Sequence, residues 1–249
     1  MGKKNVEYYD SLRLNEWKEL DSLGPSSLSR YRIICNLIRK YGLMDNLLDV
    51  GCGSGVLLNY IKLKNHFRDL WGSDFSQQSI DLAKNFEVNV FRADLLHLSD
   101  FSGSRYNSII CSEVLEHIEE DEKAIANLFE LLQPSGKIIV TVPFSMKYWS
   151  EHDEFAGHIR RYELNELKEK FIRNNFQILD FFIWGRGLYG IYHRILMNTN
   201  PKKIMDSDGK TKLLKRIGGR ILYYIFFIDD LFLSEKTGRR IFLVAEKKG

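Results

Sequence analysis

Short apolar runs alternate along the chain with longer stretches of helical periodicity. The runs are too short for helices and suit buried strands; they are 47–50, 69–74, 88–94, 105–112, 137–144, 177–184 and 239–248. The stretches between them repeat apolar residues every three or four positions, as amphipathic helices do. Because strands and helices alternate as far as the sixth strand, right-handed crossovers predict an α/β fold with a doubly wound parallel sheet.

Two segments lie outside this alternation. Residues 5–20 and 26–41 read as helices before the first strand, the second capped by Ser26 or Ser27 and ended by Gly42. After the sixth predicted strand, residues 186–238 form a long connection with two apolar segments separated by a polar turn.

The second apolar segment of this connection has a basic flank. The flank consists of Lys210, Lys212, Lys215, Arg216 and Arg220. Asp229 and Asp230 interrupt the apolar run that follows, so it is too short to cross a bilayer. Two interpretations remain open: a lid or dimer contact, or a membrane-surface segment over residues 210–233.

Composition places only weak limits on the size of the domain, its partners and its location. With 249 residues, 44% of them hydrophobic, the chain can bury one substantial domain and carry one insertion. A net charge of +3 gives no strong attraction to nucleic acid or anionic lipid. The 3 cysteines are few and widely spaced, which argues against a disulfide framework. The first residues, MGKKNVEYYD, lack the apolar core of a signal peptide. We therefore expect a cytoplasmic protein, either soluble or peripheral at a membrane.

A glycine-rich turn marks the strongest candidate binding site. Asp49 to Gly55 read D-x-G-x-G-x-G, directly after the first predicted strand and before a helix. Glycines let a ligand approach the backbone, and the first N–H groups of the helix point toward it. A dinucleotide fingerprint starting at Gly51 would need glycine at position 56, where Val56 stands. The spacing therefore disfavours a dinucleotide.

The D-x-G-x-G-x-G turn resembles the first motif of class I S-adenosylmethionine-dependent methyltransferases, and LLQPSGKIIVTVP resembles a later passage of the same family. The resemblance implies a Rossmann-like sheet of seven strands, with the last strand antiparallel at the edge and helices on both faces. It also implies a domain organisation: N-terminal helices over the cofactor in 1–45, a core in 46–185 and 239–249, and the insertion in 186–238.

Cofactor residues follow from position and from this resemblance. Asp74 ends the second predicted strand, about 20 residues beyond the glycines. At this position a carboxylate can accept hydrogen bonds from ribose hydroxyls. The resemblance places Phe75 against the adenine, Asp94 near its amino group and the Leu95 backbone beside the ring. The full expected set is Asp49, Gly51, Gly53, Gly55, Asp74, Phe75, Asp94, Leu95 and Cys111, with Ser112 next to it. Arg30 or Arg32 is a candidate to bind the carboxylate of the cofactor. The alternative is that both arginines lie on a solvated face of their helix.

An acidic and histidine cluster follows the fourth predicted strand. Glu113, Glu116 and His117 read E-x-x-E-H, and on a helix starting there they would share one face. Two carboxylates and an imidazole can hold a divalent cation such as Mg²⁺ with open positions for a substrate oxygen. His158, four residues before Tyr162, is a further candidate ligand.

This cluster resembles the metal motif of ubiquinone-biosynthesis O-methyltransferases and that of small-RNA 3′-terminal 2′-O-methyltransferases. The residues between His158 and Tyr162 differ from the RNA family. Class I enzymes that bind no metal also read E-x-L-E-H, and there His117 would be a helix cap, a substrate contact or a general base. His152 and Asp153 are interpreted as structural or substrate-contacting.

The prediction is transfer of a methyl group from S-adenosylmethionine to a small or lipid-linked hydroxyl acceptor, with His117 and His158 as catalytic candidates. The alternatives are 2′-O-methylation of RNA, an oxidoreductase, and a cofactor-binding protein without catalysis. The oligomeric state stays open.

Overall fold

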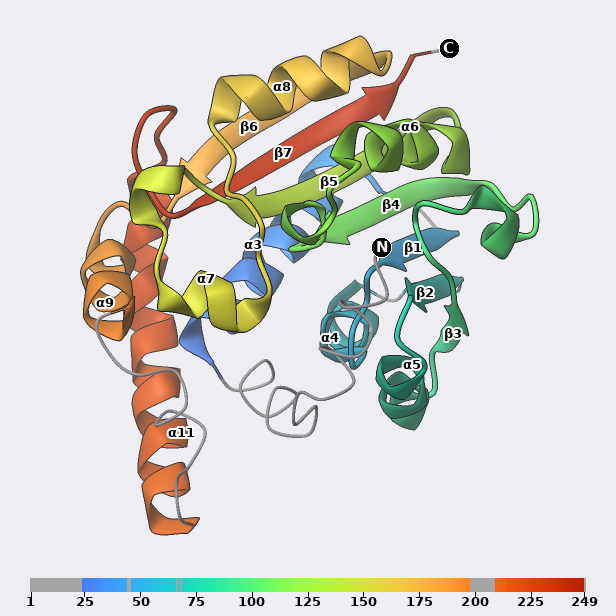
Figure 1. Ribbon diagram of the computed structural model, residues 1–249. Helices are drawn as coiled ribbons and strands as arrows, with labels where there is room; N and C mark the ends of the chain where they lie inside the picture. Colours follow the sequence, from blue (N-terminus) through green and yellow to red (C-terminus); the bar gives the residue numbers. More distant parts are fainter. Residues whose placement is uncertain (1–23, 44–45, 66, 68, 198–208, 249) are drawn as a thin grey trace.

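The computed structural model describes residues 24–43, 46–65, 67, 69–197 and 209–248. The helix predicted over 5–20 lies outside these residues. Within them the strands are β1 Leu47–Val50, β2 Leu70–Asp74, β3 Asn89–Arg92, β4 Tyr106–Ser112, β5 Leu132–Pro143, β6 Phe176–Trp184 and β7 Arg240–Lys247. They form one seven-stranded sheet in the order β3-β2-β1-β4-β5-β7-β6 (Figure 1).

Strands β1 to β5 pair in parallel, so their carboxyl ends meet at one edge of the sheet. The order reverses between β1 and β4, where ligands of open α/β sheets bind. β7 runs antiparallel to both of its neighbours, as predicted. Its expected place at the edge was wrong, because β7 lies between β5 and β6. Residues 241–245 are buried because their side chains pack alternately into the cores on the two faces of the sheet.

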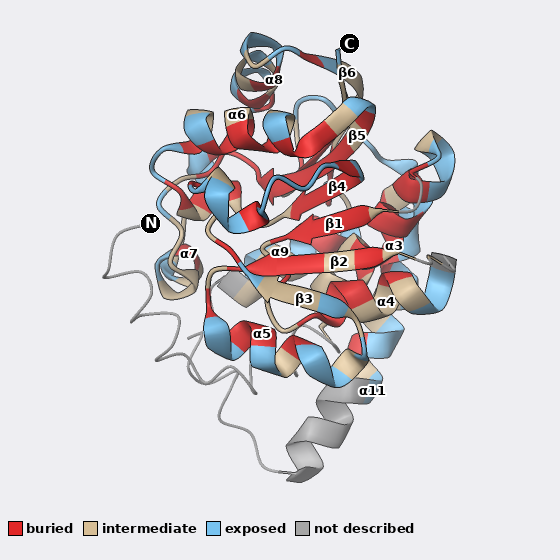
Figure 2. Ribbon diagram, turned by 90° about the vertical axis from the view of Figure 1, so that its right-hand side faces the viewer, coloured by how far each residue is buried: buried red, intermediate tan, exposed pale blue. Residues whose placement is uncertain are grey.

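Helices cover both faces of the sheet. They are α3 Pro25–Tyr41, α4 Val56–Asn65, α5 Gln77–Ala83, α6 Asp121–Leu131, α7 Glu151–Ala156, α8 Leu164–Arg173, α9 Leu188–Met197 and α11 Gly209–Ile225. One core packs α6 and α8 on the sheet, and the other packs α3, α4 and α9 on the opposite face. Alternate strand residues enter opposite cores, as with Ile109 and Ile110. Figure 2 shows the strands at the centre of the sheet buried and β3 more exposed at one edge. The predicted doubly wound fold is confirmed.

Several boundaries differ from the predictions. α3 starts after Gly24 with Pro25 in its first turn, so neither Ser26 nor Ser27 is its cap. The helix does end at Gly42, which is left-handed with φ 61°. β5 begins at Leu132 rather than after a Gln-Pro-Ser-Gly turn, and a left-handed Ser135 (φ 58°) bends it there.

The connection after β6 is anchored by two buried or half-buried aspartates. In it α9 and α11 are followed by the 3-10 segment η5 Phe226–Leu231. Asp229 accepts hydrogen bonds from the backbone N–H groups of Gly187 (2.7 Å) and Tyr189 (2.9 Å). Asp230 accepts from Arg32 of α3 and from the Trp184 indole (3.0 Å). In the described chain, every helix is too short or too polar to span a membrane.

Candidate functional site

The glycine turn after β1 is held by the backbone and carboxylate at the end of β2. Gly51 N–H donates to the Ser73 carbonyl (2.7 Å), and Gly53 N–H donates to Asp74 Oδ2 (2.9 Å). The other Asp74 oxygen accepts from Ser76 N–H (2.9 Å). Asp74 therefore fixes the turn and at the same time lines the space in front of it.

Gly51 and Gly53 differ in what a side chain at their positions would contact. Gly51 has φ 71°, and a Cβ there would lie 2.4 Å from Val114 Cγ2. Gly53 has φ 53°, and a Cβ there would meet nothing within 4 Å. Gly51 is thus required by packing, whereas Gly53 borders open space that a ligand can enter.

That space is a cavity of about 430 Å³ at the carboxyl edge of the sheet, a size typical of cofactor sites. Predicted cofactor residues that line it are Gly51, Gly53, Asp74, Phe75, Asp94 and Leu95. Three others do not line it. Asp49 is buried beneath the turn, Gly55 packs against Ala83 of α5, and Cys111 is fully buried in the core. Cys111 points into a core because strand residues alternate between faces.

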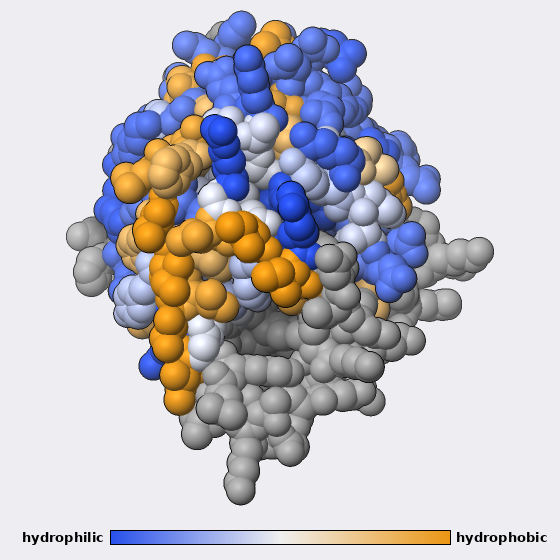
Figure 3. All heavy atoms as spheres, turned by 90° about the vertical axis from the view of Figure 1, so that its left-hand side faces the viewer, coloured by the Kyte–Doolittle hydropathy of each residue, from blue (hydrophilic) through white to orange (hydrophobic). Residues whose placement is uncertain are grey.

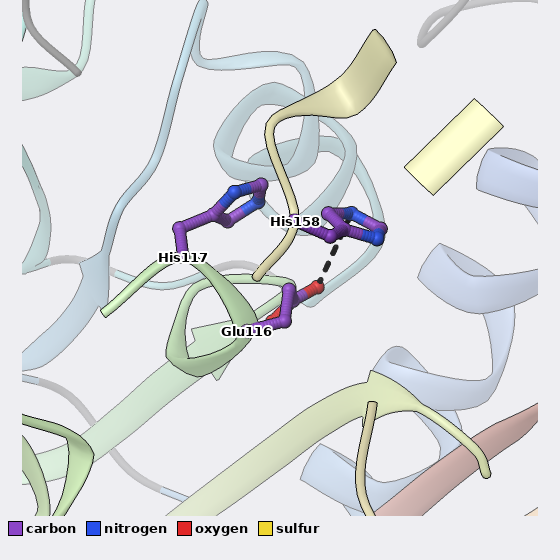
Figure 4. A group of neighbouring side chains, drawn as sticks. All are labelled: Glu116, His117 and His158. Carbon is purple, nitrogen blue, oxygen red and sulfur yellow. Dashed lines mark ion pairs between the residues drawn. The ribbon is translucent and has the colours of Figure 1, made fainter. Parts of the chain in front are cut away.

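Two histidines, His117 and His158, also line the cavity, and the buried Glu116 lies next to them. Glu116 and His117 lie on the 3-10 turn η3 Leu115–His117, and His158 lies on the loop after α7. Figure 4 shows the three side chains beside one another. One ligand atom from each residue lies within 4.8 Å of the others. Nε2 of His158 is 3.9 Å from Oε1 of Glu116.

Both imidazoles are oriented by acceptors at Nδ1. His117 Nδ1 is 3.0 Å from the Gly157 carbonyl, and His158 Nδ1 is 2.8 Å from Asp153 Oδ1. Because these acceptors take an Nδ1 proton, the neutral form of each ring has its lone pair on Nε2. Asp153 is itself held by Arg161, through contacts of 2.8 and 2.9 Å. This carboxylate–histidine arrangement is typical of metal ligands.

Burial shifts the pKa values of His117 and Glu116 toward their neutral forms. Burial, followed by the charge of His158, lowers the pKa of His117 to about 4, so its ring is neutral at neutral pH. Burial and then the charge of Glu113 raise the pKa of Glu116 well above its usual value. Glu116 is 0% exposed, and in the described chain neither of its oxygens has a hydrogen-bond partner. A buried carboxylate without hydrogen-bond partners is costly, and a cation would stabilise it.

Glu113 does not belong to this group. The expected shared helix face was wrong, because Glu113 has φ 59° and the residues after it form only a 3-10 turn. Its carboxylate accepts from Arg240 Nε (3.0 Å) and Nη2 (2.9 Å) and lies 3.4 Å from Arg30. Burial raises the pKa of Glu113, but the charges of Arg240 and Arg30 outweigh burial and lower it to about 2.

Of the two arginines proposed for the cofactor carboxylate, only Arg30 lies at the cavity. Arg30 lines the cavity, whereas Arg32 binds Asp230 and lies over the Phe227 ring at 3.7 Å. Arg240, which also lines the cavity, was missed in the sequence. It is 127 residues from Glu113, and no local spacing signals that pairing.

Comparison with known proteins identifies the family of the chain. A family model described as a methyltransferase domain matches residues 13–180, more than half of the chain. The chain therefore belongs to the methyltransferase domain family.

Individual relatives are more distant. The ubiquinone biosynthesis O-methyltransferase of Coxiella burnetii is 33% identical over 144 residues, covering 55% of this chain and 60% of that protein. The protein of the same name from Rickettsia canadensis is 26% identical over 159 residues, covering 58% and 65%. The match thus spans less than two thirds of these relatives. Magnesium protoporphyrin IX methyltransferase from Synechocystis, solved with bound SAH, has a TM-score of 0.61 at 14% identity, covering 98% and 99% of the two chains. That likeness shows the fold alone.

Proposed function

We propose that the protein is an S-adenosylmethionine-dependent methyltransferase acting on the hydroxyl oxygen of a small or lipid-linked acceptor. One observation carries the proposal: a single cavity is lined by the glycine turn and its aspartates, and also by His117 and His158. The relatives named for ubiquinone biosynthesis make a phenolic or catechol acceptor the first candidate.

The cavity is lined by both acidic and basic side chains. Asp74 and Asp94 offer carboxylates that can accept hydrogen bonds from ribose hydroxyls and an adenine amino group. Arg30 and Arg240 also line the cavity, and both pair with the carboxylate of Glu113. We assign Arg30 to the carboxylate of the cofactor. Asp49, Gly55 and Cys111 would act on the cofactor only through the turn and the core.

S-adenosylmethionine supplies an electrophilic methyl group, so the protein has to hold the acceptor in line with it. Val114 and Ile118 give this part of the cavity an apolar wall. His117 and His158 present their Nε2 atoms to the same region, beside Glu116.

We further propose that Glu116, His117 and His158 hold a divalent cation. The cation would lower the pKa of an acceptor hydroxyl. One carboxylate and two imidazoles suit Mn²⁺, Fe²⁺ or Zn²⁺, whereas Mg²⁺ prefers oxygen ligands. A pKa of about 4 makes His117 a weak general base, which favours the ligand role over direct proton abstraction.

Methylation of RNA is less well supported. Tyr162 stands where the motif of the RNA family has its aromatic residue, but the residues at 159–161 differ from that family. Tyr162 is 0% exposed and donates a hydrogen bond to Asp121 Oδ2 (2.8 Å). We interpret Tyr162 as a structural residue that joins the loop to α6.

The test is transfer of labelled methyl from S-adenosylmethionine to a catechol with a polyprenyl tail, to catechol itself and to short RNA. We expect transfer to a catechol, and its loss with Glu116→Gln but not with the exposed control Glu119→Gln. Chelator should abolish activity, and Mn²⁺ or Zn²⁺ should restore it. Transfer to RNA alone would overturn the assigned acceptor. Full activity of Glu116→Gln would overturn the metal site.

A further inference from the structure

An exposed apolar band covers α9, α11 and η5. Its members are Leu188, Ile191, Ile195, Ile217, Ile221, Tyr224, Ile225, Phe227, Ile228, Leu231, Phe232 and Leu233. Their exposed fractions run from 38% to 79%, and in the described chain only four other large apolar side chains are exposed, far apart in sequence. Figure 3 shows the band as a continuous stretch of hydrophobic atoms along this face. Contiguous apolar surface of this kind marks an interaction site.

Helix geometry explains why the band faces outward. Ile217, Ile221 and Tyr224 recur every three or four residues and so share one face of α11. Leu222 and Phe226 lie on another face and pack into the core with Trp184. The segment is therefore apolar on two sides, and only one of them is used inside the protein.

Charge identifies what covers the outer side. Residues 209–228 contain five basic and no acidic residues, with Arg220 exposed one turn from Ile217. In the sequence, Asp206 and Asp208 precede this stretch, and Asp229 and Asp230 follow it. Asp229 and Asp230 bind inward to backbone N–H groups, Arg32 and Trp184. We propose that the apolar band is a docking surface for an anionic lipid bilayer, on which α11 lies in the interface. A second copy of this chain is disfavoured, because pairing the bands would bring two basic flanks together.

The docking surface is connected to the cavity. Arg32 joins α3 to η5 through Asp230 and the Phe227 ring, and the same helix α3 contributes Ser27 and Arg30 to the cavity lining. In Figure 1, α9 and α11 lie beyond the carboxyl ends of β4 and β5, as α7 does. Docking through the band would thus place the cavity near the membrane, where a lipid-linked acceptor resides.

The test is co-sedimentation of the full chain with vesicles of phosphatidylcholine, with and without phosphatidylglycerol, at low and high salt. This binding requires neither cofactor nor acceptor, so its outcome is independent of the proposed catalysis. The variants are Ile221→Ser/Leu231→Ser and Arg220→Glu. The matched control is Leu63→Ser, because Leu63 is 69% exposed on α4, outside the band. Circular dichroism checks that each variant is folded.

We expect binding that requires phosphatidylglycerol and weakens at high salt. The double variant should reduce the partition coefficient at least about tenfold, since each buried side chain contributes that order of affinity. Arg220→Glu should reduce it severalfold, and Leu63→Ser should leave it unchanged. Absence of vesicle binding would overturn the proposal. So would equal binding by the double variant, or a concentration-dependent dimer that the double variant abolishes while vesicles bind neither form.

Discussion

Glu113 and Glu116 are three residues apart, yet the same substitution to glutamine should change the stability of the metal-free protein in opposite directions. Glu113 is held by Arg240, Arg30 and Thr141, whereas both oxygens of Glu116 are buried without hydrogen-bond partners in the described chain. Removing the Glu113 carboxylate leaves the largely buried guanidinium of Arg240 without its partner. Removing the Glu116 carboxylate relieves an unsatisfied buried acid.

The magnitudes follow from burial. Breaking one side of a buried ion pair costs about 3–5 kcal/mol, so Glu113→Gln should lower Tm by about 6–20 °C. An unsatisfied buried polar group costs about 1–3 kcal/mol, and more when charged. Since a buried amide keeps part of that cost, Glu116→Gln should gain about 1–2 kcal/mol, or roughly 2–8 °C in Tm.

The pH dependence gives a second check with a definite sign. The folded-state pKa of Glu116 is raised above its unfolded value, so the folded protein binds the proton more tightly. The stability of the metal-free wild type should therefore fall as pH rises from the unfolded pKa toward the raised folded pKa, by up to about 1.4 kcal/mol per unit. Glu116→Gln should lack this decline, and its advantage should increase with pH.

The assay is urea unfolding and thermal melting of chelator-treated protein from pH 5 to pH 8, followed by addition of Mn²⁺ or Zn²⁺. Metal should stabilise the wild type and Glu113→Gln but not Glu116→Gln. A loss of stability in Glu116→Gln comparable to that in Glu113→Gln would refute the reasoning, because it would mean that hydrogen bonds already stabilise the Glu116 carboxylate.

Three further predictions test other contacts. Asp74→Ala should weaken S-adenosylmethionine binding about 10–100-fold in titration calorimetry, since charge-assisted bonds contribute about 1.5–3 kcal/mol; unchanged affinity would contradict the ribose and turn roles. Asp153→Asn should weaken Mn²⁺ or Zn²⁺ binding about 10–100-fold at unchanged cofactor affinity, because the carboxylate orients His158; equal metal affinity would remove Asp153 from the site. Arg32→Ala should speed proteolysis within 209–233, because Asp230 and Phe227 lose their partner on α3; an unchanged cleavage rate would mean that this link does not anchor the segment.

Much of the fold could be predicted because its signals are local. A short apolar run, three spaced glycines and a helix predict the turn after β1, and Asp74 is found by its place at the end of β2. The helix on the E-x-x-E-H segment was wrong because a left-handed non-glycine residue leaves no mark in the pattern. Glu113 takes that conformation, and Arg240 and Arg30 then bind its carboxylate.

The missing parts of the site depend on tertiary contacts. Arg240 comes from the last strand, which inserts between β5 and β6, so its approach to Glu113 depends on strand order. Asp153 precedes His158 by only five residues, but its role appears once Arg161 and the short helix α7 close the loop. Spacing found the candidate ligands, whereas their supporting partners required the fold.

The most direct measurement is titration calorimetry of S-adenosylmethionine and S-adenosylhomocysteine into the folded protein at two temperatures, so that a zero enthalpy at one of them cannot hide binding. The account predicts one site for both nucleosides, weakened by Asp74→Ala and retained by Glu116→Gln. No heat with either nucleoside at both temperatures would contradict it.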